Sequence, residues 1–207
     1  MWYSTADHDH PLKSSIAMSR DAFCPRCGGS LLQRYVEERE RQVCSRCGRI
    51  HYRNAKPCAC ALVVQGGRVL LVRRAIEPFY GYWDIPGGFL EADEHPAAGA
   101  VREIEEETGL RIRPTALLGI YVDTYGTEDE YTLNIHYLAE VVSGEPRPAS
   151  DVSELAWFAP HELPSDLAFR SDYEALADWQ RAMRGELTPM ALTSENRIGH
   201  LEPEECD

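Results

Sequence analysis

A run of glutamates near the middle of the chain is the segment best suited to chemistry. On an α-helix, Glu103, Glu106 and Glu107 would share one face, because residues three and four apart are neighbours there. Their carboxylates would span only about 6 Å along the axis. Carboxylates this close raise one another's pKa, and hard divalent cations such as Mg²⁺ or Mn²⁺ would relieve the repulsion. The spacing predicts a metal-binding helix face, although an ordinary acidic surface helix would carry the same residues.

Four of the seven cysteines form two Cys-x-x-Cys pairs, which are Cys24 with Cys27 and Cys44 with Cys47. A gap of two residues lets a tight turn direct both thiolates at one ion, and Gly28 and Gly48 relieve the backbone just after each pair. A disulfide or a redox dithiol would use the same residues, but two pairs separated by 16 residues favour a four-cysteine zinc site. We expect no metal role for the remaining cysteines, Cys58, Cys60 and Cys206.

The composition changes along the chain in a way that predicts separate modules. Between Arg20 and Lys56 there are nine Lys and Arg against four Asp and Glu, whereas the last 22 residues hold six acidic residues and one arginine. We therefore expect a mobile tail over 1–20, a zinc-binding module over 21–55, a globular domain over 56–184 and an acidic tail over 185–207. Met18 is a candidate natural start.

The globular part shows alternating strand and helix patterns. The expected strands are 59–64, 68–73, 117–122, 131–142 and 155–158, with Gly66-Gly67 as a hairpin turn between the first two. A helix is expected over 96–108, beginning at Pro96 and ending before Gly109. A second helix is expected over 172–184, with Ser171 and Glu174 as a capping box.

Length and charge exclude several classes of protein. The chain has 207 residues, 43% of them hydrophobic, which suits one domain with a small satellite rather than a disordered chain. The net charge of −13 argues against a surface devoted to nucleic acid or anionic lipid. No apolar run approaches the roughly 20 residues of a membrane span. Because no signal peptide is visible and the cysteines are spaced for metal, we expect a cytoplasmic protein.

The segment from Gly88 to Leu110 resembles the Nudix box at every fixed position. It has a glycine, five residues, Glu94, seven residues, and then Arg-Glu-Ile-Glu-Glu-Glu-Thr-Gly-Leu from Arg102. With the four-cysteine module, the chain is similar to the zinc-ribbon members of that family, which include NADH pyrophosphatases and FAD/ADP-ribose pyrophosphatases. The resemblance implies an α+β fold, a Nudix α/β/α sandwich with a mixed β-sheet, preceded by a small zinc ribbon.

The resemblance also implies an activity, which is Mg²⁺- or Mn²⁺-dependent hydrolysis of the pyrophosphate bond in a nucleoside diphosphate linked to another moiety. FAD, ADP-ribose and NADH-like dinucleotides are the expected substrates. The Ser-Gln-Pro-Trp-Pro-Phe-Pro motif of the NADH-specific members is absent from this sequence, and residues 163–169 are more similar to the FAD/ADP-ribose group. The alternatives are cleanup of altered nucleoside triphosphates and a non-catalytic nucleotide- or nucleic-acid-binding regulator.

By the same resemblance, Glu103, Glu106, Glu107 and the carbonyl of Gly87 hold the catalytic cations, and Arg102 fixes Glu103 through a paired hydrogen bond. Glu94 anchors the loop. The general base stays open between Glu103, the loop 128–130, and Asp151 and Glu154, which we prefer. The candidates for stacking on a substrate base are Phe79, Tyr82, Trp83 and Tyr125, which core packing would equally explain. Zinc-ribbon relatives often pair, so a homodimer is a further expectation.

Overall fold

The structure is a computed structural model that describes residues 22–126 and 130–192. It divides into two compact units, Met1–Arg53 and Asn54–Asp207, which are described separately. The expected N-terminal tail, including Met18, lies outside the described residues, as does the chain after residue 192.

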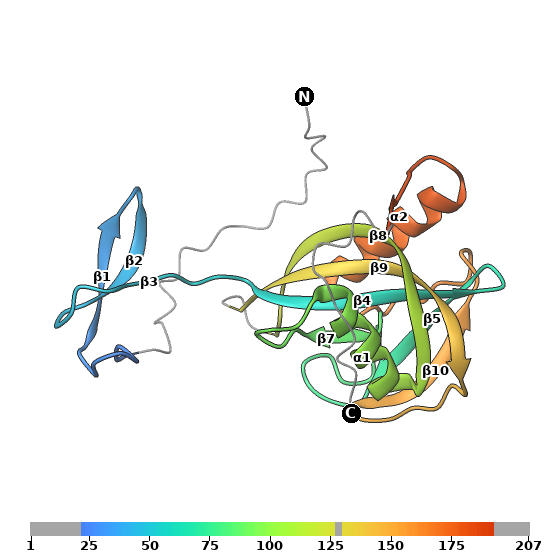
Figure 1. The fold of residues 1–207 in the computed structure, drawn as a ribbon, viewed down its shortest axis with the longest axis horizontal. Coiled ribbons are helices and arrows are strands. Elements are labelled where there is room, and N and C mark those ends of the chain that lie inside the picture. Colours follow the sequence, from blue (N-terminus) through green and yellow to red (C-terminus); the bar gives the residue numbers. More distant parts are fainter. Residues whose placement is uncertain (1–21, 127–129, 193–207) are drawn as a thin grey trace, which may run out of the picture. The chain divides into compact units, whose positions relative to one another are not determined.

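The smaller unit is a three-stranded antiparallel sheet with few buried residues. Its strands are β1 (Leu31–Val36), β2 (Arg39–Cys44) and β3 (Ile50–His51), in the order β1-β2-β3 (Figure 1). Four of the six residues of β1 are exposed, so the sheet lacks an apolar face large enough to stabilise it. A sheet this small needs a further source of stability, such as a bound metal.

The four predicted cysteines supply the donors for such a metal. Their Sγ atoms all lie within 4.8 Å of one another, with 3.9 Å between Cys24 and Cys47 and 3.5 Å between Cys27 and Cys44. Zinc bound to four thiolates at about 2.3 Å places sulfur atoms about 3.8 Å apart, so this donor set fits a tetrahedral zinc ion. All four cysteines are free thiols, which rules out the disulfide alternative in this structure.

Two similar turns direct the sulfur atoms inward. The N–H of Gly28 donates to the carbonyl of Cys24 at 2.8 Å, and the N–H of Gly48 donates to that of Cys44 at 3.0 Å. Both glycines have a φ of +70°, a conformation that side chains disfavour, so the predicted role of these glycines is confirmed. Backbone N–H groups of Cys47 and Arg46 donate to Cys44 Sγ and lower its pKa to about 6.

The larger unit contains a mixed sheet and two helices. The strands are β4 (Lys56–Gln65), β5 (Arg68–Arg74), β6 (Trp83–Asp84), β7 (Gly87–Phe89), β8 (Leu110–Thr124), β9 (Tyr131–Gly144), β10 (Val152–Phe158) and β11 (Met190–Ala191). The helices are α1 (Pro96–Thr108) and α2 (Arg170–Met183). The sheet order is β10-β5-β4-β9-β8-β11, with β6 beside β5 and β7 beside β4. The β4–β9 pair is parallel and the other pairs are antiparallel.

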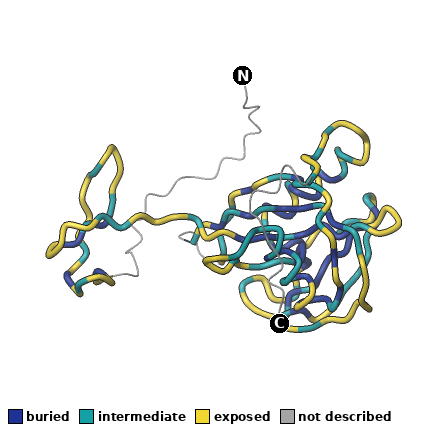
Figure 2. Tube along the Cα trace, in the orientation of Figure 1, coloured by how far each residue is buried: buried dark blue, intermediate teal, exposed yellow. Residues whose placement is uncertain are grey.

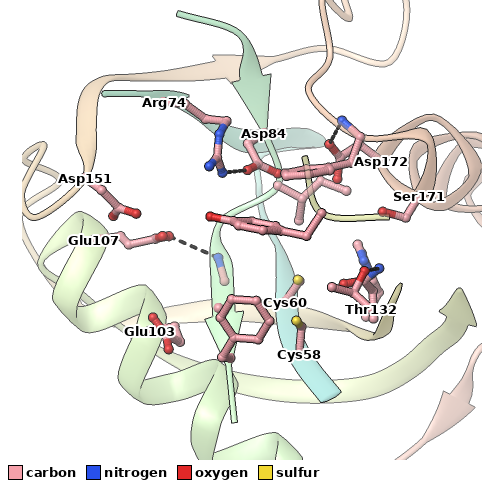
Figure 3. Close-up of a pocket in the computed structure, with 18 of the residues that line it drawn as sticks. Cys58, Cys60, Arg74, Asp84, Glu103, Glu107, Thr132, Asp151, Ser171 and Asp172 are labelled. Atoms are coloured by element: carbon pink, nitrogen blue, oxygen red, sulfur yellow. Dashed lines mark hydrogen bonds and ion pairs between the residues drawn. The ribbon is translucent and has the colours of Figure 1, made fainter. Parts of the chain in front are cut away.

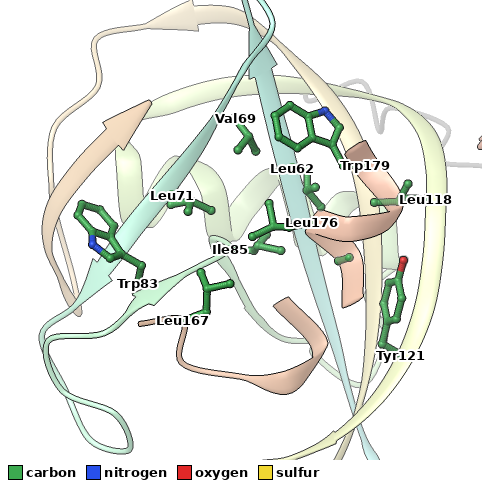
Figure 4. Close-up of a cluster of buried hydrophobic side chains, with 11 residues drawn as sticks. Leu62, Val69, Leu71, Trp83, Ile85, Leu118, Tyr121, Leu167, Leu176 and Trp179 are labelled. Carbon is green, nitrogen blue, oxygen red and sulfur yellow. The ribbon is translucent and has the colours of Figure 1, made fainter. Parts of the chain in front are cut away.

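The two helices cover opposite faces of the sheet. Leu62 of β4 packs in one buried cluster with Leu176 and Trp179 of α2 (Figure 4), whereas its neighbours Ala61 and Val63 pack in a second cluster with residues of α1. Adjacent residues of a strand face opposite ways, so these clusters lie on the two faces of the sheet. Figure 2 shows the buried residues concentrated along these strands. The expected α/β/α sandwich is therefore confirmed.

Helix α1 begins and ends where the sequence predicts. His95 is the N-cap, and its Nδ1 accepts a hydrogen bond from the N–H of Ala97 at 3.2 Å; Pro96 follows as the first helical residue. Gly109 ends the helix with a φ of 70°. A Cβ at Gly99 would overlap the side chain of Leu90, so this mid-helix glycine permits the loop before α1 to pack against the helix.

Several elements differ from the sequence prediction, among them α2, β8 and β11. Helix α2 begins at Arg170, with Phe169 as N-cap, and Asp172 instead of Glu174 accepts the backbone N–H of the N-cap. The expected capping box at Ser171 is therefore wrong. Strand β8 begins at Leu110 because shifts of register around Pro114 let the strand continue through the proline. Residues Met190–Ala191, expected in a solvated tail, pair with β8 as β11. No described helix is long and apolar enough to cross a bilayer.

We predict that zinc stabilises the smaller unit. Cys27→Ser and Cys44→Ser should lose the zinc, about one ion per chain, because each variant removes one of four thiolates. Metal content measured by atomic emission checks this, with proteolysis of residues 22–53 as a second readout. Cys58→Ser is the matched control, since Cys58 lies outside the cluster. Wild-type zinc content in both variants would contradict the assignment.

Candidate active site

A cavity of about 300 Å³ opens in the larger unit beside α1 (Figure 3). Its walls come from α1, from the β6–β7 segment and from the N-terminal ends of β4 and β9. The start of α2 and the residue before β10 also contribute. The size lies at the lower end for small-molecule binding sites.

Three carboxylates form one wall of the cavity. Glu103 and Glu107 project from α1, and Asp151 lies beside them, just before β10 (Figure 3). Burial raises the pKa of Glu107 well above its usual value, and the charges of Asp84 and Asp151 raise it further. Burial also raises the pKa of Glu103, with the guanidinium of Arg102 opposing the change. Buried carboxylates without a compensating charge are costly, and a cation would offset that cost.

The two glycines of β7 permit close contacts with β4 and with the carboxylates of α1. The N–H of Gly87 donates to Glu107 Oε2 at 3.0 Å. A Cβ at Gly88 would lie 2.6 Å from the carboxylate of Glu103, and a Cβ at Gly87, whose φ is 151°, would lie 2.5 Å from the carbonyl oxygen of Ala59. A larger residue at Gly87 would push β7 away from β4, and a larger residue at Gly88 would displace the carboxylate of Glu103.

Arg102 connects the loop before α1 to the helix. Its Nε and Nη2 donate to the two oxygens of Glu94 at 2.8 and 2.9 Å, and its Nη1 donates to Glu103 at 2.8 Å. The paired hydrogen bond that we expected for Glu103 is therefore made with Glu94, and Glu103 receives a single bond. Glu94 also accepts the N–H of Glu91 at 3.2 Å, which fits its expected role as an anchor of the loop.

The other predicted carboxylates lie away from the cavity lining. The side chain of Glu106 is 55% exposed and accepts from Arg102 Nη1 at 3.4 Å. Glu154 forms an ion pair with Arg73 at 3.1 Å. Glu130 pairs with Lys56 at 3.3 Å, and residues 127–129 of the same loop lie outside the described residues. Of the two general-base candidates that we preferred, only Asp151 lines the cavity.

The predicted aromatic residues separate into three environments. Tyr125 lines the cavity, and Phe79 packs edge-on against a cavity residue, Phe169, with ring centroids 5.3 Å apart. Tyr82 is largely exposed and contacts Phe79. Trp83 is buried in the core against Phe158 at 5.0 Å. Core packing therefore accounts for Trp83.

The sequence interpretation missed an aromatic and ionic group on the far wall. Phe169 stacks on Tyr125 with centroids 5.8 Å apart and an interplanar angle of 16°. The guanidinium of Arg74 lies over both rings and forms a buried ion pair with Asp84 at 2.7 Å. Burial, together with the charge of Asp84, raises the pKa of Asp172 well above its usual value. The sequence did carry one signal for this group, because Asp84 is an acidic residue within the otherwise apolar run Trp83–Pro86.

A second missed group lies on β9, where Thr132, Asn134 and His136 are buried polar residues lining the cavity. Their alternation along an expected strand places them on one face. The sequence therefore carried the signal, but it could not show that this face borders the cavity.

Metal-ligand geometry distinguishes the two units. Within residues 22–126 and 130–192, the four cysteines are the one set of three or more potential ligand side chains gathered within 4.8 Å. The cavity wall instead offers the carboxylates of Glu103, Glu107 and Asp151, and Mg²⁺ or Mn²⁺ typically binds one or two carboxylates together with waters and substrate phosphates.

Two family models match the chain and divide it as the structure does. A model described as "NUDIX domain" matches residues 55–180, and one described as "Nudix N-terminal" matches residues 22–53.

Curated relatives carry names of nucleotide-hydrolysing enzymes. An ADP-ribose pyrophosphatase of Methanocaldococcus jannaschii is 34% identical over 125 residues, covering 60% of this chain and 72% of the relative. A NAD-capped RNA hydrolase NudC of Pseudomonas aeruginosa is 33% identical over 165 residues, covering 78% of this chain. The match spans 56% of the length of that NudC.

The solved structures agree with the family models. A Nudix hydrolase from Nitrosomonas europaea superposes with a TM-score of 0.69 at 29% identity, over 80% of this chain and 94% of the other. A MutT Nudix hydrolase from Burkholderia pseudomallei superposes with a TM-score of 0.57 at 32% identity, over 61% of this chain and 98% of the other. Because the domain model matches more than half of its residues, this chain belongs to the Nudix hydrolase family and carries the Nudix N-terminal zinc ribbon.

Proposed function

We propose that this protein hydrolyses the pyrophosphate bond of a nucleoside diphosphate linked to another moiety, with ADP-ribose, FAD and NADH-like dinucleotides as the substrate class. The observation that carries the proposal is the single cavity wall on which Glu103, Glu107 and Asp151 meet, opposite a wall of aromatic and polar side chains. The first wall suits a cation-bound diphosphate and the second suits a nucleoside. The names of the ADP-ribose pyrophosphatase and NudC relatives support the same class.

The carboxylates of α1 would hold the cations. Glu103 and Glu107 face the cavity, Glu106 lies on the adjoining surface, and the carbonyl of Gly87 is the candidate backbone ligand. A bound Mg²⁺ or Mn²⁺ would neutralise charge on the diphosphate and acidify a bound water. The raised pKa values of Glu103 and Glu107 support this assignment, because a cation stabilises the charged form that burial disfavours.

The chain's own residues would position the reacting groups. Arg102 orients Glu103, and the N–H of Gly87 orients Glu107. Asp151 would accept the proton of the attacking water, with Glu103 as the other candidate base. Within the described residues, Nη2 of Arg74 is buried without a hydrogen-bond partner, so it is free to donate to an oxygen of the substrate. Tyr125, with Phe169 and Phe79 behind it, would pack against the nucleoside.

Cleanup of altered nucleoside triphosphates is the second candidate function. A MutT-like protein of Streptomyces ambofaciens is 34% identical over 110 residues and supports it. The NudC relatives are named for capped RNA, so a nucleotide at an RNA end is a substrate to include in any comparison. A homodimer remains a prediction.

A substrate panel tests the proposed function. With Mg²⁺ or Mn²⁺ present, we expect AMP to be released from ADP-ribose or FAD faster than pyrophosphate is released from any nucleoside triphosphate, in line with the names of the ADP-ribose pyrophosphatase and NudC relatives. Chromatography of the products measures this, and omission of Mg²⁺ and Mn²⁺ is the control, because a chelator could also remove the structural zinc. Turnover confined to triphosphates would favour the second candidate, and an absence of metal-dependent turnover would refute both.

We predict that Glu103→Gln, Glu106→Gln and Glu107→Gln each lower kcat at least about 100-fold, equal to about 2.7 kcal/mol in the activation barrier. Each substitution keeps the side-chain shape and removes one negative charge from the cation site. Glu105→Gln is the matched control on the same helix, because Glu105 pairs with Arg111 at the surface. Steady-state rates, together with thermal melting to establish folding, check the prediction; wild-type rates in all three variants would show that the metal face is misassigned.

The two general-base candidates near β10 are predicted to differ. Asp151→Asn should reduce kcat at least about tenfold, since Asp151 lines the cavity and positioned bases typically contribute about 100-fold or more. Glu154→Gln should stay within about threefold of wild type, because Glu154 contacts Arg73 outside the cavity lining. Rates measured from low to high pH provide the comparison. A larger loss in the Glu154 variant would reverse the assignment.

A further inference from the structure

The inner face of β9 is polar where a sheet core is normally apolar. Thr132, Asn134 and His136 occupy successive positions on that face and are 4%, 8% and 1% exposed. The next residue on the same face, Leu138, returns to the apolar core beside α2. Burying polar side chains costs free energy unless they find hydrogen-bond partners, so three in a row require an explanation.

Cys58 and Cys60 of the neighbouring strand β4 lie beside these β9 residues, and we call the five residues together the floor of the cavity. In the parallel register, Cys58 lies beside Asn134 and Cys60 lies beside His136. Burial raises the pKa of Cys58 to about 12, so its thiol is neutral at physiological pH. All of these residues line the cavity. The floor therefore offers polar groups without net charge.

The hydrogen bonds of this floor are incompletely satisfied. Asn134 Nδ2 donates to Thr132 Oγ1 at 3.0 Å. Among the described residues, neither ring nitrogen of His136 has a partner, although both are buried. The ring is held edge-on against Tyr121, with centroids 5.2 Å apart. Burial lowers the pKa of His136 to about 3, so the neutral ring presents one donor and one acceptor.

The floor and the carboxylate wall lie on different sides of the cavity. Figure 3 shows Thr132 across the cavity from Glu103 and Glu107. A substrate whose diphosphate lies at the carboxylates would therefore extend its attached group toward β9. An uncharged floor disfavours a phosphate there, whereas a planar ring with donors and acceptors on its edge matches both the floor and the stacked pair Tyr125 and Phe169.

We propose that Thr132, Asn134 and His136 form a hydrogen-bonding subsite for the nucleobase of the substrate, with His136 as the residue that determines base specificity. The proposal rests on the proposed function for its substrate class. A site built to hydrogen-bond a ligand edge rejects ligands that leave its buried groups unpaired, so this floor discriminates among bases.

Binding of nucleosides to the zinc-loaded chain, without added Mg²⁺ or Mn²⁺, tests the subsite without any catalytic step. Calorimetric titration with adenosine, guanosine, cytidine and uridine should show one base bound preferentially. His136→Phe, which keeps an aromatic ring but removes both nitrogens, should reduce that preference at least about tenfold. Asn134→Leu should reduce it as well, and His136→Gln should retain part of it, because glutamine restores a donor and an acceptor.

Two control variants separate this subsite from other effects. Tyr137→Phe also removes a buried polar group, but Tyr137 faces the α1 side of the sheet, so base preference should be unchanged. Glu107→Gln should leave nucleoside affinity unchanged while it lowers kcat at least about 100-fold. The subsite would be overturned if all four nucleosides bound equally or if none bound. An unchanged base preference in folded His136→Phe and Asn134→Leu would also overturn it. An inactive enzyme that still shows the predicted preference would refute only the proposed hydrolysis.

Discussion

The contact between β7 and α1 is the constraint on which the candidate site depends. Gly88 leaves room for the carboxylate of Glu103 against β7, while Gly87 lets β7 lie close to β4 and donates its N–H to Glu107. That approach buries the two acids and raises their pKa values, which prepares them for cations. Gly99 plays the corresponding part on the loop side of the helix, where Leu90 and Glu94 pack against it. Glycines at these contacts therefore permit the close packing that buries the carboxylates of the wall and raises their pKa values.

The two sides of the cavity suit different parts of a substrate. The α1 wall concentrates negative charge, which serves a metal-bound diphosphate but repels an uncompensated one. The β9 floor and the Tyr125–Phe169 pair are uncharged and suit a planar ring. Arg74 lies over the two aromatic rings and is fixed by Asp84, so it brings a cationic donor beside these rings. This division is what a dinucleotide-type substrate would need, since its charge and its rings are separate.

Stability in the two units has different origins. The larger unit buries apolar side chains on both faces of its sheet, so the strands and helices hold one another in place. The smaller unit exposes most of β1 and gathers its four thiols instead. Its turns bring N–H groups to Cys44 and lower the pKa of that thiol, which favours the thiolate a metal binds. Metal coordination thus replaces burial where the chain is too short for a core.

The amino-acid sequence by itself determined the features that depend on local spacing. The two cysteine turns, the bounds of α1 and its acidic face follow from intervals of two, three and four residues, which set geometry directly. The capping of α2 was mispredicted because its N-cap is Phe169, two residues before Ser171, and an apolar residue is not part of the sequence motif for a capping box. Only the tertiary structure decided that Asp151 faces the carboxylates while Glu154 does not, that Trp83 is core, and that His136 lies under the cavity. Those placements depend on sheet pairings between residues far apart in the chain, which local patterns do not encode.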